Sequence, residues 1–171
     1  VAESFGQKCY EVPVGFKYIS AKMQETDAII GGESSGGLTA KGHIHGKDGI
    51  YAASLLVEMI AVSGKKLSEI AEDIRKEYGE IHMEERAYRF TLEEKERIQK
   101  VLMEDKGLPE LPFAADHVSY LDGCKVYFQN GGWVSARFSG TEPLLRIFCE
   151  METEHEAVQV CEIFEEYLHL R

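Results

Sequence analysis

Two loops in this 171-residue chain combine residue types that bind small polar ligands. The first has the sequence GESSGG and begins at Gly32. Its glycines exclude a regular helix or strand and let the backbone approach a ligand closely. Glu33 and Ser35 place a carboxylate acceptor and a hydroxyl donor two residues apart, which suits the vicinal hydroxyl groups of a sugar. A connector with solvated side chains would have the same composition, so this loop alone leaves both interpretations open.

The second loop has the sequence RFSGTEP and begins at Arg137. The arginine offers a planar fork of donors that matches phosphate oxygens. Ser139 and Thr141 add hydroxyl donors, and Gly140 permits a tight turn whose backbone N–H groups form an anion nest. Arg146 could supply a second guanidinium group. The loop therefore predicts a phosphate site, and the alternative is a hairpin turn with a surface arginine.

The elements around the first loop alternate between strand and helix. Residues 8–14 and 28–30 have the composition of strands, and residues 16–24 have helical spacing. The apolar segment 50–62 predicts a buried helix. This alternation predicts an α/β unit whose sheet has a parallel component.

The elements around the second loop are mainly short strands between helices. Capping boxes that begin at Thr91 and Thr153 predict the starts of two helices. Asp-Gly at 122–123 and Asn-Gly-Gly at 130–132 predict hairpin turns. Strands are predicted at residues 118–120, 125–128, 133–137 and 145–149. This grouping predicts an α+β domain. We therefore expect two domains, 1–80 and 81–171, with a linker at about residues 78–90. Within it, residues 81–90 are expected to be an exposed strand or part of the linker.

Composition limits the classes of function. The net charge of −11 argues against binding to nucleic acid, although a local pocket could still bind a small anion. No apolar run approaches the roughly 20 residues that span a bilayer, so no membrane association is expected. The four cysteines are scattered without a C-x-x-C pair, so we expect a cytoplasmic location and no structural zinc site.

Both loops resemble motifs of the α-D-phosphohexomutases, the phosphoglucomutase/phosphomannomutase family. The first resembles the GE-x-SG sugar-binding loop of the third domain, and the second resembles the R-x-SGTEP phosphate-binding loop of the fourth. Segments 13–17 (PVGFK) and 47–50 (KDGI) fit the same pattern in the same order. The resemblance extends over nearly the whole chain.

The resemblance implies a fold and an activity. The fold would be part of domain 3, an α/β domain with a mixed sheet and helices, followed by a smaller α+β domain 4 with an antiparallel sheet. The enzyme would be an intramolecular phosphotransferase of carbohydrate metabolism that interconverts hexose 1-phosphate and hexose 6-phosphate. Such isomerases are phosphoproteins that use a phosphoserine, Mg²⁺ and a bisphosphorylated sugar, glucose 1,6-bisphosphate, as activator and intermediate.

The resemblance also assigns residues to the hexose phosphate substrate. Sugar binding is expected from Glu33, Ser35 and Lys17. Phosphate binding is expected from Arg137, Ser139, Gly140, Thr141 and Arg146.

The chain also departs from the family pattern. It has no T-x-SHNP-like phosphoserine loop and no D-x-D-x-D-R metal loop, and Gly37 stands where some members have a histidine. We therefore assign no catalytic and no metal-binding residue. We expect a C-terminal fragment that is inactive alone and whose partners are domains 1 and 2 of the same protein.

Two questions remain open at this point. A stand-alone sugar-phosphate-binding or regulatory module is the alternative function. Glucose, mannose and glucosamine phosphates are all open as substrates. The GESSGG loop and the segment 14–17 (VGFK) favour a phosphoglucomutase and place glucosamine last.

Overall fold

The computed structural model describes residues 1–170, which form two compact units. The first unit is Val1–Gly79, and the second runs from Glu80 to the end of the described chain. The second unit is the longer of the two.

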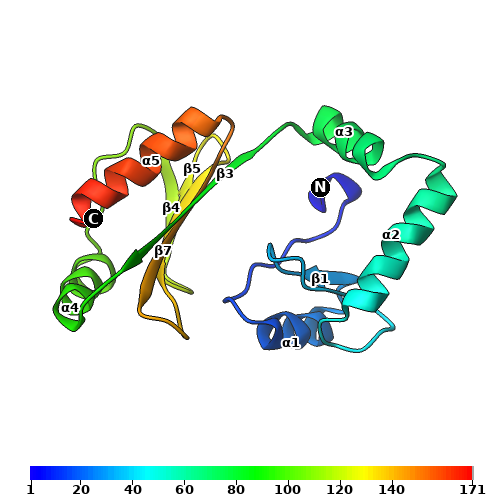
Figure 1. The fold of residues 1–171 in the computed structure, drawn as a ribbon, viewed down its shortest axis with the longest axis horizontal. Coiled ribbons are helices and arrows are strands. Elements are labelled where there is room, and N and C mark those ends of the chain that lie inside the picture. Colours follow the sequence, from blue (N-terminus) through cyan, green and yellow to red (C-terminus); the bar gives the residue numbers. More distant parts are fainter. Residues whose placement is uncertain (171) are drawn as a thin grey trace. The chain divides into compact units, whose positions relative to one another are not determined.

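The first unit consists of helices around one strand pair (Figure 1). Its elements are η1 (Glu3–Phe5), α1 (Phe16–Thr26), β1 (Ile30–Gly32), β2 (Leu38–Ala40), α2 (Gly49–Ser63) and α3 (Leu67–Tyr78). Strands β1 and β2 form an antiparallel hairpin that packs against α1 through β1 and against α2 through β2. The buried side chains of this unit are Ile19, Met23 and Thr39.

Three expectations for this unit are wrong, in whole or in part. Residues 8–14 do not form a strand, because they have no strand beside them with which to pair. The helix expected at residues 50–62 is confirmed as α2, but none of its side chains is buried. Ile50 is 84% exposed and Val57 65% exposed. Strand pairing within residues 1–79 is antiparallel, so the expected parallel component is not present there.

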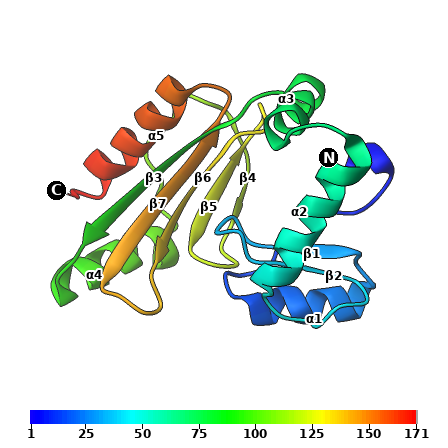
Figure 2. The ribbon, with the colours of Figure 1, turned by 45° about the vertical axis from the view of Figure 1, so that its right-hand side comes forward.

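The second unit is a five-stranded antiparallel sheet with helices on one face (Figure 2). The strand order is β3-β7-β6-β5-β4. The elements are β3 (His82–Arg89), α4 (Leu92–Gln99), the π-helical turn η2 (Lys100–Glu104), β4 (Ala115–Ser119), β5 (Cys124–Phe128), β6 (Trp133–Phe138), β7 (Leu144–Met151) and α5 (Glu154–Tyr167).

The core of this unit lies between the sheet and its helices. Alternate residues of the central strands, such as Val126, Val134 and Ile147, are fully buried and pack with Ile98 of α4 and Phe164 of α5. The residues between them point to the opposite face, as the two-residue period of a strand requires. That outer face bears Arg137 and Arg146, so the core fixes the side of the sheet on which the predicted phosphate site lies.

The local predictions for this unit are confirmed. Thr91 and Thr153 each accept a hydrogen bond from the backbone N–H three residues on, and Glu94 and Glu156 complete the two capping boxes. All four expected strands form, with boundaries shifted by a few residues. Of the two alternatives for residues 81–90, the exposed strand is confirmed as the edge strand β3.

The fold class is α/β followed by α+β, as expected.

An ion pair fixes the edge strand of the α+β unit to its helix, since Arg86 Nη1 lies 2.8 Å from Glu165 Oε2 of α5. No helix within residues 1–170 has both the length and the apolar character needed to cross a membrane.

The four cysteines give a first test of this fold. Cys9 is exposed, whereas Cys124, Cys149 and Cys161 are buried in the second unit. Burial raises the pKa of Cys124 to about 11, which keeps its thiol protonated. We expect an aromatic disulfide reagent at neutral pH to modify one thiol per native chain and four in denaturant. Rapid modification of a second thiol in the native protein would contradict the packing of β5, β7 and α5.

Candidate functional site

The first loop is the tight turn of the β1–β2 hairpin. The N–H of Glu33 donates to the carbonyl of Gly37 over 2.8 Å, and the N–H of Gly36 donates to the carbonyl of Glu33 over 2.9 Å. The Ser35 hydroxyl lies 3.5 Å from Glu33 Oε2. The turn therefore places the predicted donor and acceptor side by side, as the sequence suggested.

Lys47 joins this pair, although it was predicted only as part of the KDGI match. Its Nζ lies 2.5 Å from Glu33 Oε2. The glutamate side chain is only 15% exposed, whereas that of the lysine is 54% exposed. A Cβ at Gly37 would lie 3.0 Å from Lys47 Cδ and 3.1 Å from Glu33 Oε2. A side chain at this position would therefore require the Lys47 and Glu33 side chains to shift by a few tenths of an ångström.

The residue after Lys47 anchors it to a helix. Asp48 caps α2 by accepting from the N–H groups of Ile50 and Tyr51, each over 3.0 Å. His43 Nε2 lies 2.9 Å from Asp48 Oδ2, and its ring stacks on that of Tyr51. The Tyr51 N–H and then His43 hold the pKa of the Asp48 carboxyl group below its usual value. The Asp48 carboxylate, by capping the N-terminus of α2, thus fixes the backbone next to Lys47.

Lys17, the third residue assigned to the sugar, has a different neighbour. It lies in the first turn of α1, and its Nζ is 4.8 Å from the centroid of the Tyr18 ring. Within residues 1–79 it has no ion pair with Glu33, which is paired with Lys47. The assignment of Lys17 to the substrate stays a prediction.

The second loop joins β6 to β7. The N–H of Ser139 donates to the carbonyl of Leu144 over 2.8 Å and closes the loop. The N–H groups of Thr141 and Glu142 both point at Ser139 Oγ, at 3.4 and 3.3 Å. These hydrogen bonds are long. Two backbone donors therefore converge on one side-chain oxygen, and the anion nest expected here stays a prediction.

The two arginines assigned to phosphate lie side by side on neighbouring strands. Arg137 on β6 and Arg146 on β7 are direct partners in the strand register. Like charges placed opposite each other destabilise a sheet unless other groups compensate. Arg137 Nε lies 3.8 Å from Asp122 Oδ2. Arg146 lies 3.3 Å from Glu85 through Nη1 and 3.3 Å from Glu142 through Nη2.

The assigned residues therefore form two groups. Glu33 and Ser35 lie together in the first unit, and the five phosphate residues lie together in the second. Sequence reasoning missed Lys47 and the three carboxylates that contact the arginines. Glu85 could be found only from the strand register, because it is 61 residues away from Arg146.

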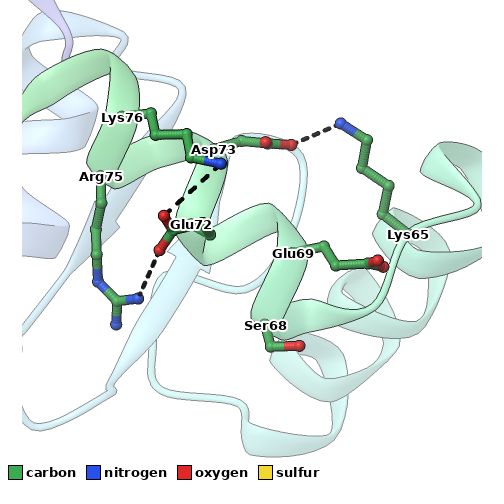
Figure 3. Close-up of a pocket in the computed structure, with 7 residues that line it drawn as sticks. All are labelled: Lys65, Ser68, Glu69, Glu72, Asp73, Arg75 and Lys76. Atoms are coloured by element: carbon green, nitrogen blue, oxygen red, sulfur yellow. Dashed lines mark hydrogen bonds and ion pairs between the residues drawn. The ribbon is translucent and has the colours of Figure 1, made fainter.

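A separate hollow of about 620 Å³ lies along α3 (Figure 3). Its charged side chains pair with one another: Lys65 with Asp73 at 2.6 Å, and Glu72 with Arg75 and Lys76. The hydrogen bond to Asp73 raises the pKa of Lys65. With its charges balanced, this hollow favours no charged ligand. Among residues 1–170 no group of three or more His, Cys, Asp or Glu side chains could hold a metal ion.

Comparison with protein families matches both units in turn. The model of phosphoglucomutase/phosphomannomutase alpha/beta/alpha domain III matches residues 1–78. The model of the phosphoglucomutase/phosphomannomutase C-terminal domain matches residues 82–166. A domain III followed by a C-terminal domain defines the C-terminal part of a phosphohexomutase. The chain belongs to the phosphoglucomutase/phosphomannomutase family.

Individual relatives agree with this membership. A phosphoglucomutase/phosphomannomutase of Thermococcus kodakarensis is 33% identical over 95% of this chain, and a phosphoglucosamine mutase of Rubrobacter xylanophilus is 28% identical over 94%. A solved structure titled as a putative phosphomannomutase, from Thermus thermophilus, superposes on 98% of the chain with a TM-score of 0.72 and 25% identity.

The chain spans about a third of the length of these relatives: 33% and 32% of the two curated proteins and 33% of the solved chain. The relatives' names include phosphoglucosamine mutases as well as phosphoglucomutase/phosphomannomutases. These names therefore do not select one sugar.

Proposed function

We propose that this chain is the substrate-binding C-terminal part of a phosphohexomutase that interconverts hexose 1-phosphate and hexose 6-phosphate. The observation that supports it most strongly is the second loop, where two cross-strand arginines flank a turn with converging N–H donors. A dianionic phosphate would accept hydrogen bonds from both sources. Family membership supplies the reaction class.

The first loop would recognise the sugar. Glu33 would accept hydrogen bonds from sugar hydroxyl groups, and Ser35 would donate or accept one, with Lys17 as a further contact. Lys47 would hold the Glu33 carboxylate in position. An intermediate that turns between two phosphoryl transfers needs contacts that accept either end of the ligand. Glucose is the sugar we favour, ahead of mannose and glucosamine.

The phosphoryl transfer itself would depend on groups outside this chain. The phosphoserine, the Mg²⁺ ligands and the domains that hold them are absent from its sequence. The proposal therefore includes inactivity of the chain alone, and glucose 1,6-bisphosphate as activator and intermediate of the larger enzyme. Four free thiols support a reducing compartment, so we place the enzyme in the cytoplasm.

Two measurements on the 171-residue chain test this proposal. With Mg²⁺, glucose 1,6-bisphosphate and glucose 1-phosphate, we expect no formation of glucose 6-phosphate in a coupled assay. Detectable turnover would contradict the proposal that the reacting groups lie outside this chain. Titration of the ¹⁵N-labelled chain with glucose 1-phosphate should shift the amide signals of Ser139 and Thr141, and unchanged signals would remove the phosphate site.

A further inference from the structure

The phosphate loop has an excess of negative charge around its two assigned arginines. Arg137 and Arg146 face three carboxylates, those of Asp122, Glu85 and Glu142. These carboxylates would offset part of the attraction between the two arginines and a phosphate dianion. A further positive charge near the loop would strengthen that attraction.

Arg89, the last residue of β3, lies where such a charge is needed. Its Cα is the register partner of Leu144, the residue whose carbonyl closes the phosphate loop with the Ser139 N–H. Alternation along β3 places Arg89 on the same outer face as Glu85, and alternation along β7 places Leu144 on the same outer face as Arg146.

The reach of a side chain from this position can be judged from Glu85. The direct partner of Arg146 on β3 is Ala87, so Glu85 and Arg89 are its two diagonal neighbours. Diagonal neighbours have Cβ atoms within about 7–8 Å. Glu85 reaches Arg146 Nη1 from its diagonal at 3.3 Å. Arg89 has the longer side chain and occupies the diagonal on the side of the loop.

Arg89 is also available to bind an anion. It is exposed, and within residues 1–170 its guanidinium group has no ion pair or hydrogen bond. We propose that Arg89 is a third phosphate-binding arginine, which contacts the anion held by the Ser139–Thr141 turn. This inference rests on the proposed function, because it adds a ligand to the same phosphate site.

The test is a titration of the ¹⁵N-labelled chain with inorganic phosphate at constant ionic strength. In the wild type, the Arg89 Nε–Hε signal should shift with the same dissociation constant as the Ser139 and Thr141 amides. Arg89→Gln should raise that constant on the order of threefold to tenfold, the range between an exposed ion pair and a charge-assisted hydrogen bond. Arg89→Lys keeps the charge and should restore part of the affinity.

The matched control is Lys100→Gln, which removes an exposed cation from η2, on the helical side of the sheet. We expect it to leave phosphate affinity unchanged, since the charge lies across the core from the loop. If Arg89→Gln behaves like this control, or if the Arg89 Nε–Hε signal stays fixed, Arg89 is not a ligand and the proposed function is untouched. If the wild-type Ser139 and Thr141 amides do not respond to phosphate, the phosphate site itself fails.

Discussion

Replacing Arg137 with glutamine is expected to weaken binding of phosphate to this chain by roughly tenfold to a hundredfold. The loss follows from one charge-assisted hydrogen bond, worth roughly 1.5–3 kcal/mol. Arg137 is only 21% exposed and its Nε lies 3.8 Å from Asp122, so its guanidinium group is already oriented before the ligand arrives. The measurement is the same phosphate titration, followed through the Thr141 amide.

Arg137→Lys separates geometry from charge in this experiment. A lysine keeps the positive charge but loses the planar fork. The phosphate affinity of the lysine variant should therefore fall between those of the wild type and the glutamine variant. A glutamine variant that binds phosphate as tightly as the wild type would remove Arg137 from the site. Equal phosphate affinities for the lysine variant and the wild type would show that the planar guanidinium group adds nothing beyond its charge.

Replacing Gly123 with alanine should destabilise the second unit by about 2–4 kcal/mol. Gly123 has φ +87°, and a Cβ there would lie 2.6 Å from the carbonyl oxygen of Ala136 and 3.0 Å from Arg137 Cβ. The turn before β5 must therefore move away from β6, and Asp122 with it. Urea denaturation followed by the fluorescence of Trp133, the single tryptophan, measures the loss.

Gly131→Ala is the matched control for this substitution. Gly131 has φ +91° in another turn of the same sheet, but a Cβ there would have nothing within 4 Å. It should cost only the backbone strain, about 1–2 kcal/mol. The difference between the two variants isolates the close contact, and equal costs would mean that the turn before β5 relaxes freely.

Signals confined to a few adjacent residues predicted the structure well. The capping boxes at Thr91 and Thr153 and the hairpin turns of the second unit are local, because the interacting groups lie within a few residues. The same holds for the turn that places Glu33 beside Ser35.

Predictions that depended on distant partners were less successful. The composition of residues 8–14 suits a strand, but a strand needs another beside it, and composition does not supply one. The apolar character of α2 predicted burial without identifying the surface that would cover it. The ion pair between Lys47 and Glu33 and the place of Arg89 both depend on how separate segments meet. An alternating pattern is visible in β3, but its register with β7 is not.

The unequal cores of the two units have a consequence for cooperativity. The first unit buries Ile19, Met23 and Thr39, whereas the second has a continuous core that includes Val126, Ile147 and many others. Equilibrium unfolding of this chain should not be a single two-state transition, so one melting temperature will not describe it. The transition with the lower melting temperature would belong to the unit that contains Glu33. Any contact that covers the apolar side chains of α2 would raise that melting temperature. Organisation of the sugar loop would then be thermodynamically linked to association, while the phosphate loop would be organised without it.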